Sequence, residues 1–479
     1  MRLARPWLVI VVSVGVAAAL VFVPALSGRL VSDTWYHLDV ARTRMPLDVL
    51  WRYVPRGNEW YRPSTELVYW LSYRLVGTDA LPMHLVGLGA HIASTVLIGR
   101  LAWRLTLDRV AAVAAAVAFL FTIHAGEVIF DTADIHLSFA TLFLLAAVLI
   151  HVEGRRLVSA ALALISLTFA EVGILALPLI GLYEVVVLRG ATHGMRIRAT
   201  ARRLAPLVGL SLAYVVVRVL VGGFYAEGVD RCLSPYCLWA GAAEYMDRLV
   251  IRGDPVLAGL WEAKIPFTIA VVSALGMIAL LVQPWRWPDT RPLVFGMCWA
   301  MGASLFFMLA LFPYVSDRFL YVPDVGVALA IGATVAALRT AGPPRAPIPP
   351  PVAYLLATVF TGWVALSAAG LAGRASGYQA AGERAAAILD GVVAQVRQVP
   401  PGTTVLVNGV PRMDDPLFPP GNTGPYVFLN GLGPAVRIVL GDAAPLVVTE
   451  LRDVPTGSPL LTLTVIGSTV SGSPGLPPP

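Results

Sequence analysis

The sequence predicts an all-α polytopic membrane bundle of about eleven transmembrane helices, with a long first external loop and a small C-terminal external α/β domain. Three observations support this fold class. Apolar residues make up 57% of the 479 residues and charged residues only 13%, and the mean hydropathy of +0.74 excludes an ordinary soluble domain. Long apolar runs recur along the chain, and the composition changes after residue 374.

The apolar runs are the predicted spans, because about 20 apolar residues cross the roughly 30 Å hydrocarbon core. The run from Leu8 to Leu26 is longer than the core of a secretory signal, so we expect a retained first span, with a cleaved signal peptide as the alternative. The predicted spans lie near residues 8–26, 81–103, 108–123, 136–152, 157–170, 172–188, 204–222, 265–283, 292–313, 319–338 and 352–373.

Arginines cluster in alternate loops between these spans, and these loops all fall on one side of the membrane. Arg2, Arg100, Arg155 and Arg339 belong to such loops, and an excess of basic residues marks the cytoplasmic side. We therefore expect a multi-pass protein of the cell membrane with a cytoplasmic N-terminus and an external C-terminal domain. The net charge of +6 comes from these loops, so it gives no reason to expect a nucleic-acid partner.

The stretch 157–188 is too long for one span and carries Glu171 near its middle. A carboxylate at the centre of a spanning helix costs about 2.5–3.5 kcal/mol on insertion scales. Two short helices that meet at a tight turn would instead place Glu171 at the outer face. We therefore predict a helical hairpin here.

The chain after residue 373 has the composition of a small domain. We divide the sequence into a transmembrane domain 1–373, an external α/β domain 374–470 and a disordered tail 471–479, with a proline-rich cytoplasmic linker at 340–351. A helix is expected at 375–398. Short β-branched runs predict strands at Thr404–Asn408, Tyr426–Leu429, Val436–Leu440, Leu446–Leu451 and Leu460–Val465.

The three cysteines give little functional information. Cys232 and Cys237 fall in a predicted external loop, where they form either a small disulfide loop or two free thiols. Cys298 lies inside a predicted span and is expected to be buried.

The first external loop, 27–80, combines acids, arginines and aromatic residues. Residues 38–53 fit an amphipathic helix lying on the membrane, and aromatic residues are common anchors at the headgroup level. These two functions account less well for Asp33, which stands close to the end of the first span beside Trp35 and His37. Asp33 is either a solvated loop acid or a residue that carries chemistry at the membrane surface.

The second external loop is short and rich in groups that bind protons: His124, Glu127, Asp131, Asp134 and His136. A connection between two spans needs only polarity and a turn, so this density indicates function. Carboxylates and histidines also bind divalent cations, and a metal is therefore one candidate cofactor. No standard metal-binding spacing is present.

Two further positions are candidates. His84 and His91 lie seven apart, on one face of the second span, either hydrogen-bonded in the bundle core or as functional groups in the membrane. Arg318 stands at the outer end of a predicted span, where its planar fork suits a phosphate, unless it pairs with Asp317 or with a loop acid.

Several of these segments resemble one family, the polytopic type C glycosyltransferases of the protein O-mannosyltransferase type. The resemblance rests on Trp60-Tyr61-Arg62-Pro63 followed by Met83-His84-Leu85 and His91, on the loop His124–Asp134, on Ala170-Glu171-Val172-Gly173, and on Asp317-Arg318-Phe319-Leu320-Tyr321-Val322-Pro323. These segments occur in the family's order and span about residues 8–375. No nucleotide-binding glycine loop is found, which fits a lipid-linked donor.

The resemblance implies a membrane glycosyltransferase of the cell envelope. Such enzymes move a hexosyl or pentosyl group from a polyprenyl-phosphate donor to an acceptor hydroxyl on a protein, glycan or lipid at the outer face. Asp33 matches the catalytic base by position. The other residues follow by their segments: catalytic Glu127 and Asp134; substrate-binding Tyr61, Arg62, His84, His124, Glu171, Arg318 and Tyr321; and metal candidates Asp33, Asp131 and Asp134.

Three departures from the family leave the metal requirement and the sugar open. Asp33 lies between Ser32 and Thr34, where relatives often carry a second acid, and Ala125 and Ala170 replace a proline and a lysine. We expect transfer in one displacement with inversion, and we expect Asp33, the His124–Asp134 loop, Glu171 and Arg318 to converge on one cavity.

Two other classes of protein compete with this interpretation. A transporter or flippase of lipid-linked or anionic substrates also uses membrane carboxylates and histidines. However, the charges here cluster in loops, and no inverted repeat is visible. A membrane anchor that presents residues 374–479 would not need about eleven spans.

Overall fold

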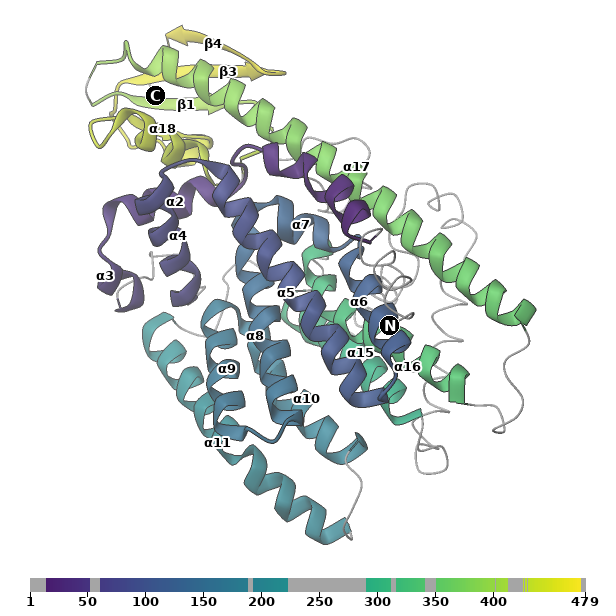
Figure 1. The fold of residues 1–479 in the computed structure, drawn as a ribbon. Coiled ribbons are helices and arrows are strands. Elements are labelled where there is room, and N and C mark those ends of the chain that lie inside the picture. The colour runs from purple at the N-terminus through teal and green to yellow at the C-terminus, as the bar shows by residue number, and fades with distance from the viewer. Residues whose placement is uncertain are drawn as a thin grey trace.

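The computed structural model describes residues 14–51, 61–187, 193–222, 290–311, 316–340, 350–400, 402–411, 425, 427–428 and 430–474. This part of the chain is mostly helical and ends in a small sheet, as Figure 1 shows. The predicted span 265–283, the cysteines Cys232 and Cys237 and the linker 341–349 lie outside the described residues.

The helices follow one another along the chain with short connections. Residues 14–22 are helical. The labelled α-helices are α2 Thr34–Thr43, α3 Pro46–Trp51, α4 Pro63–Val76, α5 Ala80–Thr106, α6 Arg109–Leu120, α7 Ala125–Phe130, α8 Ile135–Val152, α9 Arg156–Phe169, α10 Ala176–Leu182, α11 His193–Gly222, α15 Arg291–Leu311, α16 Tyr321–Thr340, α17 Pro350–Val396 and α18 Leu432–Leu440. Short 3₁₀ helices are η1 Pro24–Ser27, η2 Thr132–Asp134, η3 Glu171–Leu175, η6 Asp317–Leu320 and η7 Leu451–Asp453, and η4 Tyr183–Val187 is a π-helical turn.

The centre of the bundle consists of α5, α6, α8, α15 and α16, with α9, α11 and α4 on one flank. Trp299, Phe119 and Tyr321 are fully buried there. Gly296 of α15 and Gly326 of α16 face each other so closely that a Cβ at either would collide with the opposite backbone. Small residues allow this close helix packing, which replaces the hydrophobic driving force that is missing in lipid.

Five helical segments in the described part of the chain are long and apolar enough to cross a membrane: Ala80–Thr106, Thr132–Val152, Thr200–Arg218, Arg291–Leu309 and Asp317–Arg339. Two other predicted spans are short. Helix α6 has 12 residues and α9 has 14, which gives lengths of about 18 and 21 Å at 1.5 Å per residue. The expected number of about eleven spans therefore stays a prediction.

Helix starts and ends follow from local chemistry. The carboxylate of Asp108 accepts the N–H groups of Val110 and Ala111 and so caps the N-terminus of α6, and Asp79 caps α5 in the same manner. Glu153, beyond the end of α8, binds Arg100 and Arg104 of α5, at 2.6 and 3.3 Å. The loop after α8 and the arginine cluster at the end of α5, both predicted on one side of the membrane, therefore meet at one end of the bundle.

The helical hairpin predicted around Glu171 is present as α9 and α10, which are joined by η3. The turn is tight, because a Cβ at Gly173 would collide with the backbone of Ser166 and Leu167. The single amphipathic helix predicted at 38–53 is wrong. Two helices, α2 and α3, cover the described part of this stretch, with a break at Arg44 and Met45 before Pro46, since a proline disfavours helical conformation at the preceding residue.

Helix α17 runs across the predicted border between the membrane and C-terminal domains. The sequence suggested a span at 352–373 and a separate helix at 375–398, but one helix of 47 residues runs through both. No proline follows Pro351 within it, and isolated glycines in an alanine-rich helix cost only about 1 kcal/mol each. The proposed boundary at 373/374 therefore falls inside a helix that connects the bundle to the sheet (Figure 1).

The C-terminal sheet has the strand order β2-β1-β3-β4. Strand β1, Thr404–Asn408, pairs in parallel with β2, Leu446–Val448, and with β3, Leu460–Ile466. Strand β4, Thr469–Pro474, forms an antiparallel hairpin with β3. The strand predictions at 404–408 and 460–465 are confirmed, and the one at 446–451 is confirmed for its first three residues.

Two predictions in this domain are wrong. The run Val436–Leu440 belongs to helix α18, because a short apolar run fits either period and its contacts with α2 and α17 favour a helix. The predicted disordered tail begins inside β4, where Ser471, Gly472 and Ser473 gain extended structure by pairing with β3. Val427 and Phe428 lie outside any strand, and the rest of the predicted strand Tyr426–Leu429 lies outside the described residues.

Candidate functional site

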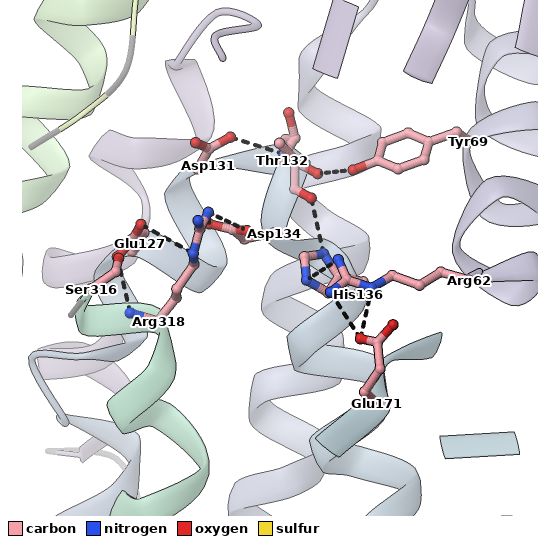
Figure 2. Close-up of polar contacts among 11 residues, drawn as sticks. Arg62, Tyr69, Glu127, Asp131, Thr132, Asp134, His136, Glu171, Ser316 and Arg318 are labelled. Carbon is pink, nitrogen blue, oxygen red and sulfur yellow. Dashed lines mark hydrogen bonds and ion pairs between the residues drawn. The ribbon is translucent and has the colours of Figure 1, made fainter. Parts of the chain in front are cut away.

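Polar side chains from five parts of the chain meet at one end of the bundle. They come from the start of α4, from the α7–η2–α8 connection, from η3, from α11 and from η6 at the start of α16. Figure 2 shows their contacts. The group divides into a cluster around Arg318 and a cluster around Arg62, connected by residues 131–136.

Arg318 is held by two acids of the second predicted loop. Its Nη1 donates to both carboxylate oxygens of Asp134, at 3.0 and 3.1 Å. Its main-chain N–H donates to Glu127 Oε2 at 2.9 Å, and the Ser316 hydroxyl donates to the same oxygen. Glu127 and Asp134 are buried, while the Arg318 side chain keeps 21% of its surface accessible. The predicted pairing of Arg318 with a loop acid is thus realised with Asp134, at the start of α8.

Arg62 forms the second cluster with Glu171 and His136. Its Nε and Nη2 donate to Glu171 Oε2 at 3.2 and 2.9 Å, and Arg218 Nη1 donates to the other Glu171 oxygen at 2.7 Å. Arg62 Nη1 lies 2.9 Å from His136 Nε2. Arginine only donates, so His136 accepts at Nε2 and carries its proton on Nδ1, which faces the Ala133 carbonyl at 3.1 Å.

The surroundings shift the pKa values of two carboxyl groups, Glu171 and Asp131, in opposite directions. Burial raises the pKa of Glu171, but the positive charges of Arg62 and Arg218 outweigh it, and the net pKa lies below its ordinary value. Burial, and next the negative charge of Asp134, raise the pKa of Asp131 well above its usual range. Asp131 Oδ1 accepts the Ala133 N–H at 2.9 Å, and its buried Oδ2 has no hydrogen-bond partner within the described part of the chain.

The helix that begins after Asp33 is joined to this group by hydrogen bonds. The hydroxyls of Thr34 and Thr132 lie 2.8 Å apart, and Tyr69 donates to the Thr132 carbonyl at 2.6 Å. Burial first, and then the charges of Glu66, Asp131, Asp134 and Asp33, raise the pKa of Tyr69 well above its ordinary value. The charge of Asp33 therefore raises the pKa of the same tyrosine as the charges of the two acids of the second loop.

His37, one turn after Asp33, contacts two residues of α4. Its Nδ1 lies 2.7 Å from Glu66 Oε1, and its ring stacks on Tyr69 with the ring centroids 4.5 Å apart. Burial lowers the pKa of His37, but the charge of Glu66 and the hydrogen bond to it raise the pKa more, so that the net shift is upward. The short α2–α4 contact thus places a proton-binding group beside Asp33.

Other predicted substrate residues lie in separate contacts. His124 Nδ1 pairs with Asp324 Oδ2 at 2.8 Å, and the Tyr321 hydroxyl lies 2.8 Å from His91 Nδ1. His84 Nδ1 lies 3.4 Å from the Ile129 carbonyl, and the main-chain oxygen of Tyr61 accepts from Tyr214. These contacts agree with the bundle-core alternative for the two span histidines. A substrate role for His84, His124, Tyr61 or Tyr321 stays a prediction.

A cavity of about 560 Å³ opens beside the Asp33 loop. Trp35 lines it together with Leu30, Asp79 and the α17 residues Leu389 and Asp390, and its lining includes neither Asp33 nor Arg62 nor Arg318. The expected shared cavity is therefore not this one. The clustering of Asp134, Glu127 and Arg318 is as expected, whereas Glu171 forms part of the neighbouring cluster with Arg62.

The metal candidates do not form a recognisable site. Among the residues that the structure describes, no three His, Cys, Asp or Glu side chains converge as metal ligands would. Asp134 is engaged by Arg318, and Asp33 accepts a main-chain N–H group. The three candidates Asp33, Asp131 and Asp134 therefore form no three-ligand site among the described residues.

Some site residues were not predicted from the sequence. Arg218, Thr132 and Tyr69 have structural roles in the two clusters that the motifs did not suggest. Arg218 had a usable signal, since an arginine inside the predicted span 204–222 is rare and marks a functional or paired position. Thr132 and Tyr69 are ordinary residues of a loop and a helix, and only their contacts identify them.

Glu171→Gln is expected to lower the melting temperature at pH 7. It should also reduce the fall in melting temperature that wild type shows as the pH is lowered. Because the folded pKa of Glu171 lies below its unfolded value of about 4.3, its stabilising effect is present above that value and is lost as the pH falls through the folded pKa. Melting temperatures of the detergent-solubilised protein between pH 7 and pH 3 measure this. Glu450→Gln, with 40% of the native side chain accessible, is the control. Equal slopes for wild type and Glu171→Gln would contradict the prediction.

The fold is similar to that of two crystal structures of ArnT from Cupriavidus metallidurans, one bound to undecaprenyl phosphate and one in the apo state. Both give a TM-score of 0.53 and cover 96% of this chain and 93% of the ArnT chain, at 18% and 16% sequence identity. The archaeal oligosaccharyltransferase AglB from Archaeoglobus fulgidus, in complex with an inhibitory peptide and a dolichol-phosphate, gives 0.46 at 14% identity, with 93% and 65% covered.

No protein-family model and no curated protein sequence matches the chain. The similarity to ArnT is therefore seen in the structure and does not come through a close sequence relative. Together with the five apolar helical segments of the described residues, it indicates a membrane protein. It also agrees with the fold that the sequence resemblance implied, since the chain has the fold of the two ArnT crystal structures.

Proposed function

We propose that this protein transfers a sugar from a polyprenyl-phosphate donor to an acceptor hydroxyl on the outer face of the membrane, with Asp33 as the general base. The observation that carries the proposal is the pair of arginines, Arg62 and Arg318, each held by acids while about one fifth of its side chain stays accessible. A guanidinium fork pairs well with phosphate oxygens. The ArnT crystal structure of the same fold was obtained with undecaprenyl phosphate bound.

The proposed reaction is one displacement with inversion at the anomeric carbon of the sugar. The acceptor hydroxyl is a weak nucleophile until a base takes its proton, and Asp33 accepts that proton as the new C–O bond forms. The bond between the anomeric carbon and the phosphate oxygen breaks, and the lipid phosphate leaves with the bonding electron pair. Arg62 and Arg318 stabilise the charge that develops on this leaving group.

Glu127 and Asp134 were expected to be catalytic, but their contacts support a different assignment. Both hold Arg318 from opposite sides through its main-chain N–H and its guanidinium group. Glu171 holds Arg62 in the same manner. We therefore assign these three acids to positioning the cations, because a group that must meet developing charge works best when it is fixed beforehand.

The function is tested with the purified full chain in detergent or proteoliposomes and a radiolabelled polyprenyl-phosphate sugar, with membrane extracts as the acceptor source. Transfer is expected to move label into a product that survives the mild acid that cleaves the sugar–phosphate bond of the donor. The Asp33→Asn variant under identical conditions is the control. Recovery of all label as intact donor, with a panel of hexosyl and pentosyl donors, would overturn the proposal.

The transporter or flippase alternative makes the opposite prediction in the same assay. A flippase would move the intact lipid-linked sugar between leaflets, so that added hydrolase reaches it, and no acid-stable product would form. That outcome would reject glycosyl transfer.

A further inference from the structure

The C-terminal domain contacts the loop that carries Asp33 directly. Asp33 Oδ1 accepts the main-chain N–H of Asn430 at 3.0 Å, and the N–H of Ser32 donates to the Val427 carbonyl at 3.2 Å. A Cβ at Gly431 would collide with the Ser32 carbonyl oxygen and lie 3.2 Å from the Trp35 Cβ. Asp33 and Asn430 are 397 residues apart in sequence, yet the backbones of their two segments pack directly against each other.

The backbone of Ser32 supports the idea that this contact imposes a conformation. Its φ is 59°, a left-handed value that residues other than glycine rarely adopt. Such a conformation persists when the surrounding structure determines it, and it clusters at functional sites. Two features of the surroundings fit this conformation. Ser32 donates a hydrogen bond to Val427, and Gly431 has no side chain that would collide with Ser32.

Ion pairs between α18 and α2 hold the same two segments together. Arg437 Nε and Nη2 both donate to Asp39 Oδ2, at 2.9 and 2.7 Å. Arg42 donates to the other Asp39 oxygen at 3.2 Å and to Asp442, at the end of α18, at 2.5 Å. Asp39 is mostly buried, with 10% of its side chain accessible, so the Arg437 pair is less screened than a surface pair.

From these contacts we infer that the C-terminal domain positions the catalytic base: Val427, Asn430 and Gly431, together with the Arg437–Asp39 pair, fix the direction of the Asp33 carboxylate. This inference rests on the proposed function. The N–H of Asn430 occupies Oδ1 of Asp33 and leaves Oδ2 to accept the proton of the acceptor hydroxyl. Arg437 does not touch substrate in this arrangement and is a positioning residue. The domain is then a part of the active site and not a separate module.

Arg437→Ala is expected to lower kcat roughly ten- to a hundred-fold, since a misplacement of about 1 Å in a reacting group has effects of that size. The KM for the lipid-linked donor should stay near wild type, because Arg62 and Arg318 are untouched. A role limited to folding would lower the yield of active protein and leave kcat per active site unchanged, so active-site titration accompanies the assay. Arg437→Lys should recover part of the loss.

Two controls make the test specific. Arg452→Ala removes an exposed ion pair with Glu450 in the same domain, at 2.5 Å, and should keep wild-type kcat. The double variant Asp39→Asn/Arg437→Ala should be no slower than the slower single variant, because both changes break the same pair. Additive losses, or a wild-type kcat for Arg437→Ala in a wild-type protein that does transfer sugar, would overturn the inference.

Amide hydrogen exchange separates this inference from the proposed function. In the Arg437→Ala variant the Ser32 N–H should exchange faster than in wild type, and the amides of α8 should not change. This measurement needs no substrate, so it reports on the contact even if the wild-type protein proves inactive with every donor. Equal exchange at Ser32 in both proteins would contradict the inference on its own.

Discussion

Replacing Asp33 by asparagine is expected to abolish sugar transfer while the protein folds normally. Asparagine has the same shape and keeps an Oδ1 that can accept the Asn430 N–H, so the loop geometry is retained. The amide cannot take a proton from the acceptor hydroxyl. Removal of a general base typically costs about 10²- to 10⁴-fold in rate, which would reduce the product below detection in a membrane assay.

The decisive comparison is between kcat and donor binding. Binding of polyprenyl phosphate, followed by native mass spectrometry or by protection against thermal unfolding, should stay within about two-fold of wild type, since the cations of the site are unchanged. Asp453→Asn, an exposed substitution in the C-terminal domain, controls for general effects on expression. Unchanged turnover in Asp33→Asn would remove Asp33 from the mechanism and would make His37, with its Glu66 partner, the next candidate base.

The sequence predicted the positions of the site residues better than their partners. Arg318 was selected at the end of a predicted span, Asp134 in a loop rich in proton-binding groups, Glu171 at a predicted turn, and Arg62 through the family resemblance. The structure brings all four into the two clusters. Their pairing depends on contacts 109 and 184 residues apart in sequence. No local pattern encodes which arginine meets which acid, so this part required the three-dimensional arrangement.

In the C-terminal domain, the sequence failed to predict the type of one secondary-structure element, and this error also hid a tertiary contact. Its β-branched runs predicted β1 and β3 correctly, but Val436–Leu440 belongs to α18 and not to a strand. A run of five residues, four of them apolar, fits a buried strand and a helix equally well. The tertiary contact decides, because α18 places Arg437 against Asp39 of α2. The same error hid the connection between this domain and the Asp33 loop, since a strand at 436–440 gave no reason to pair the two.

Arg318 is expected to give the second large effect, and its contacts change what the simplest variant would show. Arg318→Ala removes the partner of two buried acids, Glu127 and Asp134, and breaking a buried ion pair from one side typically costs about 3–5 kcal/mol. Loss of transfer in that variant alone would therefore not distinguish an unfolded protein from a missing phosphate ligand.

Arg318→Lys retains the positive charge and tests whether the planar guanidinium group is needed. A lysine ammonium is a point charge on a flexible stem, so it cannot serve Asp134 and a phosphate oxygen with the planar geometry of a guanidinium group. We expect the donor KM to rise by at least about ten-fold, equivalent to the loss of one charge-assisted hydrogen bond, with a smaller decrease in melting temperature. Arg339→Lys, which contacts Asp108 at the opposite end of α16, is the matched control and should leave the donor KM unchanged.

A double variant separates stability from function. Arg318→Ala combined with Asp134→Asn removes both members of the Arg318–Asp134 pair, so no ionised Asp134 remains without a cation. The melting temperature should therefore recover relative to Arg318→Ala. Sugar transfer should not recover, because the leaving phosphate still lacks its guanidinium partner. If the double variant regains wild-type donor KM, then Arg318 serves only to neutralise Asp134, and the phosphate must be held by Arg62 and its neighbours in the second cluster.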